Sequence, residues 1–268
     1  MNTFLRYATN YWILWIIVAV LALGTGSYFA GYRFDQAGFS RVGMLSIENL
    51  PDGSSLYIDE SSQVIALAGT GSAPLSPGSH SVIVDAPGYQ PWNERFDIVS
   101  GETVKLRPIL VKDKVAAHQL EGEDAARAIA LIRATAAPTK EAPLALAGGC
   151  ALAYAQGNRV LAEATTTADC VPPAYLACAP VSPENPTGTC ATTIIRTDTA
   201  PIKGIIKYPG RDDAAVVVGD NSVYALELDP REPQSYALLF RGPTIGVAPW
   251  SETTIVISNG TLVFELSL

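Results

Sequence analysis

The sequence predicts a mainly β protein with an N-terminal transmembrane helix, a small β-sandwich, a helical linker and a C-terminal all-β repeat domain of propeller-like character. Three observations predict this order. The segment from Ala8 to Tyr32 carries no charged residue. Residues 43–112 alternate short apolar strands with turn residues, and near the C-terminus a three-strand pattern recurs at an offset of 40.

Composition sets the classes of function that the chain can serve. Its 268 residues are enough for about two small domains, and 48% of them are hydrophobic, which supports a real core. The net charge of −8 argues against nucleic acid as a partner, because phosphate binding needs a basic face. The two histidines, His80 and His118, lie in unlike contexts, and we expect both to be solvated. No cofactor is expected.

The first predicted element is a transmembrane helix over residues 11–32, preceded by a short cytoplasmic tail at residues 1–10. Tyr11 to Leu23 is strongly apolar, aromatic residues flank it at both ends, and about 20 such residues span a bilayer. The alternative is a cleaved signal peptide with its cleavage site near Gly24 and Gly26. We expect a single-pass protein of the cell membrane, with the bulk of the chain extracytoplasmic. Small residues spaced by four could let two such helices pack closely, so an oligomer is possible.

The next region, residues 43–112, reads as consecutive short strands. Pro77-Gly78 and Pro87-Gly88 are strong turn signals, because proline presets φ and glycine accepts positive φ. The residues between them alternate, which predicts a strand. Turn signals at Leu50–Gly53 and a Gly-rich, Ser-rich loop at residues 69–77 predict further breaks between strands. Turns at this spacing are typical of a small β-sandwich.

Several motifs in this region resemble the PEGA domain. Pro51-Asp52-Gly53-Ser54 stands before Leu56-Tyr57-Ile58-Asp59, and Pro77-Gly78-Ser79-His80-Ser81-Val82 is followed by Gly88-Tyr89. The family's name motif, Pro-Glu-Gly-Ala, reads Pro-Asp-Gly-Ser in this chain, and Glu60 replaces the glycine that usually follows the aspartate. The resemblance implies a β-sandwich found mostly in envelope-associated prokaryotic proteins, with a binding or structural role and no catalytic residues.

Residues 113–140 are predicted to be a helical linker. The segment is rich in alanine and charge, and a weak apolar face predicts a helix from about Gly122 to Ala136 that ends before Pro138. A flexible tether is the alternative.

Residues 141–268 return to strand patterns and contain an internal repeat. Residues 205–209, 215–218 and 223–228 match residues 245–249, 255–258 and 263–268. A weaker third copy lies at residues 150–162. The period resembles that of β-propellers of the WD40 kind, although the Gly-His and Trp-Asp signatures are absent. About three units fit, whereas closed propellers have 4 to 8 blades.

Four cysteines lie in and beside an insertion rich in proline and threonine: Cys150, Cys170, Cys178 and Cys190. They allow three pairings, of which we favour Cys170–Cys178 with Cys150–Cys190. A zinc site is the alternative, but the chain has no Cys-x-x-Cys and no histidine near the cysteines. Disulfide bonds would fit an oxidising space outside the membrane.

These features together predict a non-catalytic envelope protein. Its PEGA-like module would bind or scaffold a cell-wall component, a surface layer or a protein partner. Tyr89, Trp92 and Trp250 are candidate contact residues, with packing in the core or in turns as the competing role. We assign no catalytic or metal-binding residue. The alternatives are a ligand-sensing subunit of an envelope signalling or secretion complex, and a glycan-active enzyme that uses adjacent acids such as Asp212-Asp213.

Overall fold

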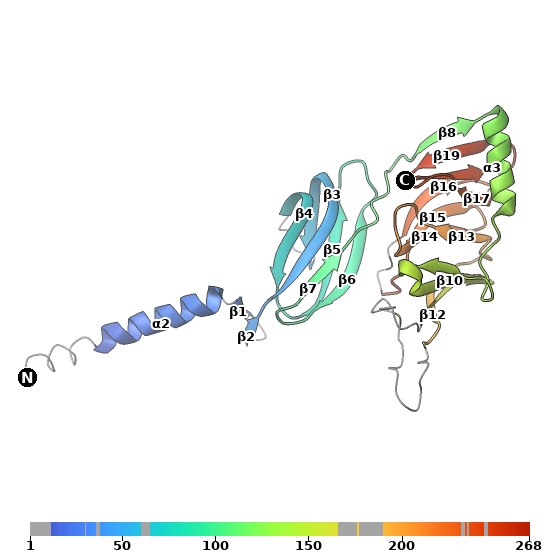
Figure 1. Ribbon diagram of the computed structural model, residues 1–268. Coiled ribbons are helices and arrows are strands. Elements are labelled where there is room, and N and C mark those ends of the chain that lie inside the picture. The colour runs from blue at the N-terminus through green and yellow to red at the C-terminus, as the bar shows by residue number, and fades with distance from the viewer. Residues whose placement is uncertain are drawn as a thin grey trace, which may run out of the picture.

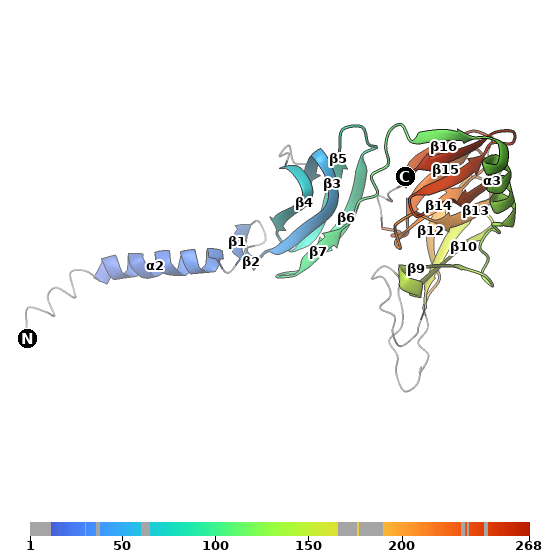
Figure 2. The same ribbon diagram turned by 45° about the horizontal axis from the view of Figure 1, so that its top comes forward.

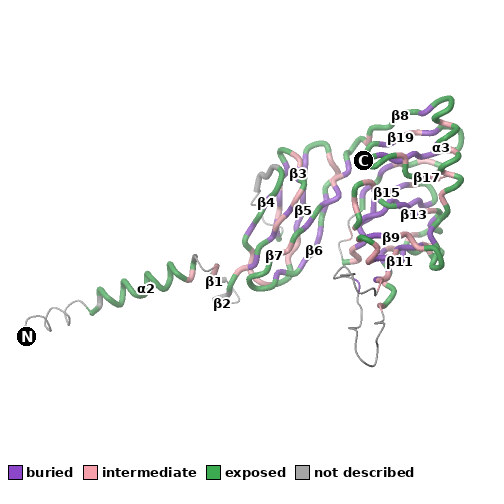
Figure 3. The backbone as a smooth tube through the Cα atoms, in the orientation of Figure 1, coloured by how far each residue is buried: buried purple, intermediate pink, exposed green. Residues whose placement is uncertain are grey.

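The structure is a computed structural model, and it describes residues 12–29, 31–35, 38–59, 65–165, 176, 190–231, 234, 236–243 and 246–268. Figure 1 shows three parts in a row: helix α2, an N-terminal β unit at residues 43–112 and a C-terminal β unit at residues 113–268. Buried positions follow the strands of both β units, whereas α2 is exposed (Figure 3).

Helix α2 corrects the predicted membrane span. It covers Trp12–Phe29, 18 residues, and carries no charge. The chain then pairs β1 (Tyr32–Asp35) with β2 (Gly38–Arg41), so the helix does not reach residue 32. Among the described residues, no helix is both long and apolar enough to cross a membrane. The predicted transmembrane helix and single-pass localisation are therefore wrong. The predicted tail, residues 1–10, lies outside the described residues.

The N-terminal β unit is built around one long, bent strand. Its strands are β3 (Gly43–Ile58), β4 (Ile65–Leu75), β5 (Gly78–Asp85), β6 (Trp92–Ile98) and β7 (Thr103–Leu106), in the order β4-β3-β5-β6 with β7 paired to β3. The first part of β3 pairs in parallel with β7, and its last part pairs with β5. Because the two halves of β3 pair with different strands, the unit forms two layers around one core, which includes Leu45, Val84 and Phe96.

The bend of β3 lies where a turn was predicted. The register with β4 shifts between Ile47 and Leu50 and again between Leu50 and Ser54, with φ of 61° at Asn49 and 78° at Gly53. Such bulges kink a strand without ending it. Residues 50–53 therefore lie within one strand. Most of the loop predicted at residues 69–77 belongs to β4 for the same reason, since it pairs with the first part of β3.

His80 corrects another expectation, because it is not solvated. Its Nδ1 lies 2.6 Å from Asp59 Oδ2 and its Nε2 lies 2.7 Å from the carbonyl oxygen of Ser76, and the side chain is 13% exposed. The amide of Ser81 donates to Asp59 Oδ1 at 2.9 Å. Asp59 and His80 thus join the end of β3 to β5. His118, by contrast, is exposed on β8.

We expect Asp59→Asn to lower the free energy of unfolding by about 1–3 kcal/mol, because it weakens a charge-assisted bond to the ring of His80. Urea unfolding measures this, with Asp85→Asn as control, since Asp85 is an exposed aspartate on β5 with no side-chain bond in the described chain. Equal effects of the two substitutions would show that the Asp59–His80 contact does not stabilise the fold.

The described residues of the C-terminal β unit form three separate four-stranded antiparallel sheets. In pairing order, the first contains β12 (Thr193–Thr197), β11 (Arg159–Ala164), β10 (Ala151–Gln156) and β9 (Leu144–Leu146). The second contains β13 (Gly204–Lys207), β14 (Ala214–Val218), β15 (Ser222–Glu227) and β16 (Tyr236–Arg241). The third contains β17 (Gly246–Pro249), β18 (Thr254–Ser258), β19 (Val263–Ser267) and β8 (Ala116–Leu120). A short 3₁₀ turn, η1 (Ala147–Gly149), follows β9.

Apolar contacts between neighbouring sheets hold this unit together. One core lies between the first and second sheets, and another lies between the second and third. Strands β14 and β18 are wholly buried and hold the same position in their sheets, and their residues are 40 apart. The propeller-like domain predicted from this repeat is not confirmed, because the three sheets of the described residues are separate and fewer than the blades of a closed propeller.

The segment predicted as a linker belongs to the third sheet. Strand β8 pairs with β19 over Ala116–Leu120, and helix α3 (Gly122–Ala134) packs on this sheet through Ala128 and Ile132. Both views show α3 along the outer side of the unit (Figures 1 and 2). The helix lies where it was expected, two residues shorter, but it does not bridge two domains.

The cysteines are described in part. Cys150 and Cys190 are each disulfide-bonded. Cys170 and Cys178 lie outside the described residues, so the predicted pairing stays a prediction. In the part of the chain that the structure describes, no group of three histidine, cysteine or acidic residues is placed to hold a metal ion.

Candidate functional site: a polar junction between the two β units

The connector after β7, residues 107–112, is embedded in both β units. Leu106 and Leu110 pack with the N-terminal core, whereas Ile109 and Val111 lie in a C-terminal core, 6% and 3% exposed. Opening the two units would pull apolar side chains out of one core or the other, which costs roughly 1.5–3 kcal/mol for each large side chain. The connector therefore resists acting as a free hinge.

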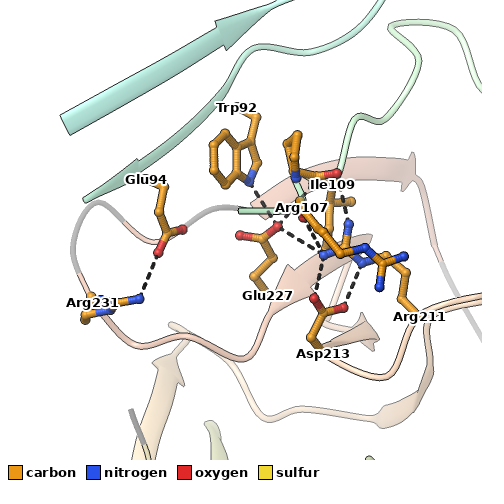
Figure 4. Close-up of polar contacts among 9 residues, drawn as sticks. Trp92, Glu94, Arg107, Ile109, Arg211, Asp213, Glu227 and Arg231 are labelled. Carbon is orange, nitrogen blue, oxygen red and sulfur yellow. Dashed lines mark hydrogen bonds and ion pairs between the residues drawn. The ribbon is translucent and has the colours of Figure 1, made fainter. Parts of the chain in front are cut away.

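Glu227 accepts hydrogen bonds from the N-terminal unit and from this connector (Figure 4). It ends β15 and is 7% exposed. Its Oε1 accepts the indole N–H of Trp92 on β6 at 3.0 Å and the amide N–H of Ile109 at 3.1 Å. Trp92 is 3% exposed and belongs to the N-terminal core. One carboxyl group of the C-terminal unit thus binds the indole of Trp92 in the N-terminal unit and the backbone amide of Ile109 in the connector.

Arg211 clamps the connector from the C-terminal unit. Its Nε and Nη2 each lie 2.7 Å from the carboxylate of Asp213 in a bidentate pair. Nη1 donates to the carbonyl oxygen of Pro108 at 2.9 Å, and Nη2 donates to that of Arg107 at 2.5 Å. The planar fork of arginine suits this geometry, and the side chain is 11% exposed.

Glu94 faces Glu227 from the N-terminal unit. It lies on β6, is 5% exposed, and its Oε1 lies 3.5 Å from Arg231 Nη2, while Arg231 also binds Asp229. Burial raises the pKa of Glu94 to about 8, and the charges of Glu227 and Asp229 add to the rise. Burial also raises the pKa of Glu227 to about 7, against the hydrogen bond from Trp92 and the charge of Arg211.

A second contact covers the outer edge of the middle sheet. The side-chain amide of Gln90 donates to the carbonyl oxygen of Leu238 at 2.8 Å and accepts from its amide at 3.1 Å. Leu238 lies on β16, an edge strand, so Gln90 satisfies one residue of that edge as a neighbouring strand would. The junction is therefore fixed at two points.

The N-terminal β unit can now be compared with known families. Its bent long strand, parallel β7 and Asp59–His80 contact surround the motifs noted in the sequence. Residues 42–113 match the model of the PEGA domain. The resemblance drawn from the motifs is thus confirmed for this segment. No curated protein matches the chain.

Between the PEGA domain and the C-terminal unit lies a cleft of about 260 Å³. Four cationic and four acidic side chains line it, together with Trp92 and Leu106: Lys105, Arg107, Arg211 and Arg231, and Glu94, Asp213, Glu227 and Asp229. Perturbed carboxyl groups in a cleft often mark a functional site. Retaining glycosidases, however, keep their two carboxyl groups about 5–5.5 Å apart to admit the glycosidic bond. In this cleft Glu94 is instead engaged by Arg231, and Glu227 by the N–H groups of Trp92 and Ile109, which suits an interface better than a catalytic pair.

The structure separates the three predicted contact residues. Trp92 lies inside the junction and is not free to meet a ligand. Trp250 packs against α3, with the guanidinium of Arg127 4.9 Å from its ring centroid. Tyr89 is half-buried, and its strand bridge to Lys112 fixes the end of the connector. All three serve packing, and Trp92 and Tyr89 also line clefts between the units.

Sequence analysis missed Glu94, Gln90, Arg211 and Glu227. One signal for Glu94 was available. It occupies an inward position of the alternating strand Trp92–Ile98, between Trp92 and Phe96, where a charged residue needs a partner. The partner itself could not be found from spacing, because Glu227 lies 135 residues from Trp92.

Proposed function

We propose that this chain is a non-catalytic scaffolding or binding protein in which the C-terminal unit holds the PEGA domain in a fixed pose. The observation that supports this most is the hydrogen bonding of Glu227 to both Trp92 and Ile109. A catalytic cleft is not needed to explain the buried charges, since each of them serves the junction. A fixed pose matters for a scaffold because it sets where a bound partner lies.

The contact surface that we propose is the outer face of the PEGA sheet. Tyr57, Ile83 and Asn93 stand side by side across β3, β5 and β6, on the face opposite the core. Ile83 is 41% exposed, and Tyr57 beside it is half-buried. An aliphatic and an aromatic side chain next to an amide suit the apolar ring face and the hydroxyl groups of a sugar. The association of PEGA domains with envelope proteins supports cell-wall glycan as the partner.

The test is co-sedimentation of the full chain with insoluble cell wall from its host. Ile83→Arg should reduce the bound fraction strongly, because it places a charge in the middle of the contact surface. Ile194→Arg is the matched control, since Ile194 is an isoleucine of the C-terminal unit with 47% exposure. Equal loss in both variants, or no binding by the unaltered chain, would contradict the proposed partner.

A second candidate function is the ligand-sensing subunit. The cleft between the units favours it, because a ligand there would contact both the PEGA domain and the C-terminal unit. Such a ligand would change how the two units dock against each other. A sensing subunit needs such a change, whereas a scaffold with a rigid junction does not.

A further inference from the structure

We propose that the cleft in the junction binds a small zwitterion of amino-acid or dipeptide size, with its ammonium group at Glu94 and Glu227 and its carboxylate at Lys105 and Arg107. The site lies inside the junction, so it does not depend on glycan binding at the outer face of the PEGA sheet. It rests on the second candidate function, the ligand-sensing subunit, because it names the class of ligand that such a subunit would detect.

Glu94 is a buried carboxyl group that lacks hydrogen-bond donors. It lines the cleft and is 5% exposed. Its one ion pair among the described residues is with Arg231, at 3.5 Å, and Arg231 also pairs with Asp229. No N–H group of these residues donates a hydrogen bond to Glu94. A buried carboxylate left without donors costs free energy, so a ligand that brings N–H groups into the cleft would be stabilised there.

Glu227 presents a second acceptor to the same cleft. The N–H groups of Trp92 and Ile109 both go to its Oε1. Its other oxygen receives no hydrogen bond from the described chain, and Figure 4 shows that oxygen on the side of Glu94. An ammonium group carries three N–H donors, so it can bind both carboxyl groups at once. Burial, with the charges of Glu227 and Asp229, raises the pKa of Glu94, and a bound ammonium group would favour its charged form.

An ammonium group suits this pair better than a metal ion does. Calcium takes about 6–8 oxygen ligands, and magnesium needs a near-octahedral set. In the described part of the chain, no group of three histidine, cysteine or acidic residues is placed to hold a metal ion. Two carboxyl groups are enough for the hydrogen bonds of one ammonium group. The acidic side of the cleft therefore points to an amine.

Two cations of the cleft have no acidic partner. Lys105 and Arg107 flank Leu106, which packs in the PEGA core, so their side chains point away from that core. Both line the cleft and are exposed, and neither makes an ion pair within the described residues. The other two cations, Arg211 and Arg231, are already paired with aspartates. A carboxylate on the ligand would supply the partner that Lys105 and Arg107 lack.

The size and the lining of the cleft limit the rest of the ligand. The volume is about 260 Å³, below the range of about 300–1,000 Å³ that is usual for sites of drug-sized ligands. Eight of the ten lining residues are charged. A ligand of one or two amino-acid residues suits such a cleft, because a short apolar part joins its two opposite charges.

The test is isothermal titration calorimetry of the full chain with alanine and with the dipeptide alanyl-alanine. Two matched probes each lack one charge: the N-acetylated dipeptide has no ammonium group, and the dipeptide amide has no carboxylate. We expect saturable binding of alanyl-alanine and about tenfold weaker binding of the acetylated probe, because the lost bonds are charge-assisted and buried. The amide should bind about two- to fivefold more weakly, because Lys105 and Arg107 are exposed to water.

Variants assign each charge of the ligand to its side chains. Glu94→Gln should weaken the binding of alanyl-alanine by about tenfold. Replacing Lys105 and Arg107 together by glutamine should abolish the difference between alanyl-alanine and its amide. Because both of these positions are exposed, this double variant covers the case in which Glu94→Gln fails to fold. Glu102→Gln, an exposed position outside the cleft, should bind as the unaltered chain does.

Three outcomes would overturn the site: no saturable binding of alanine or alanyl-alanine, equal affinity for alanyl-alanine and the acetylated probe, or unchanged affinity in Glu94→Gln. Hydrogen exchange on peptides that cover residues 107–112 separates the site from its use, because the amide of Ile109 donates to Glu227. Selective binding that leaves this exchange unchanged would support the site and overturn the sensing function. Selective binding that alters the exchange would support both.

Discussion

Replacing Trp92 with alanine is expected to lower the free energy of unfolding by about 3–5 kcal/mol, the range for truncating a buried aromatic residue. The loss has two sources. The indole packs within the PEGA core, and its N–H donates to a buried carboxyl group of the C-terminal unit. Without the indole, Glu227 loses one of these two N–H donors and keeps the amide of Ile109. The junction should therefore weaken together with the core.

Trp92→Phe separates these two sources. Phenylalanine retains most of the ring packing but cannot donate to Glu227, so we expect a smaller loss of about 1–3 kcal/mol. Guanidinium unfolding of both variants, followed by circular dichroism, measures the difference. If Trp92→Phe proved as stable as the unaltered chain, the bond between Trp92 and Glu227 would contribute nothing to the junction.

Arg211→Ala is the second large effect that we expect, a loss of about 2–4 kcal/mol. The substitution leaves the carbonyl groups of Arg107 and Pro108 without their donor and Asp213 without its bidentate partner. Arg211→Lys should recover little, because one ammonium group cannot reach all three acceptors with the geometry of a guanidinium.

The control is Lys207→Ala, which removes an ion pair with Asp212 whose two side chains are about half exposed. Such surface pairs contribute about 0–1 kcal/mol. Thermal unfolding of the three variants ranks the effects. Losses of equal size for Arg211→Ala and Lys207→Ala would mean that the clamp on the connector has no more value than a surface pair.

The strands of the PEGA domain were predictable because their signals are local. Alternation and the Pro-Gly turns located β5 closely, and β6 buries every second residue. The bend in β3 was not predictable in the same way. Pro51-Asp52-Gly53 is a turn signal, and only the pairing of both halves of the strand with β4 makes it a kink within a strand.

Strand β8 shows why the linker was misread. Four of its five residues are exposed, and Ala116–Leu120 has neither β-branched residues nor apolar alternation. Its conformation is imposed by hydrogen bonding to β19 at the far end of the sequence. Likewise, an uncharged N-terminal run predicted a membrane span, although the helix ends at Phe29 after the sequence Gly24-Thr25-Gly26-Ser27.

The junction lay beyond sequence reasoning because its members are distant in the chain. The aromatic residues attracted attention as contact residues, yet Trp92 and Trp250 are both held in packing. The buried acids that define the junction gave only a weak local signal. Position in a fold, and not residue type, decides whether a tryptophan meets a ligand or a neighbouring domain.

The fixed pose of the PEGA domain is tested most directly by a distance between the two units. Spin labels attached through a ketone-bearing amino acid at Asp85 and at Glu252 avoid the cysteines, and both positions are exposed. Pulsed electron resonance on the full chain at about pH 5.5 should give one narrow distance distribution, which Trp92→Ala broadens. A broad or multiple distribution in the unaltered chain would show that the two units move independently, and would contradict the account.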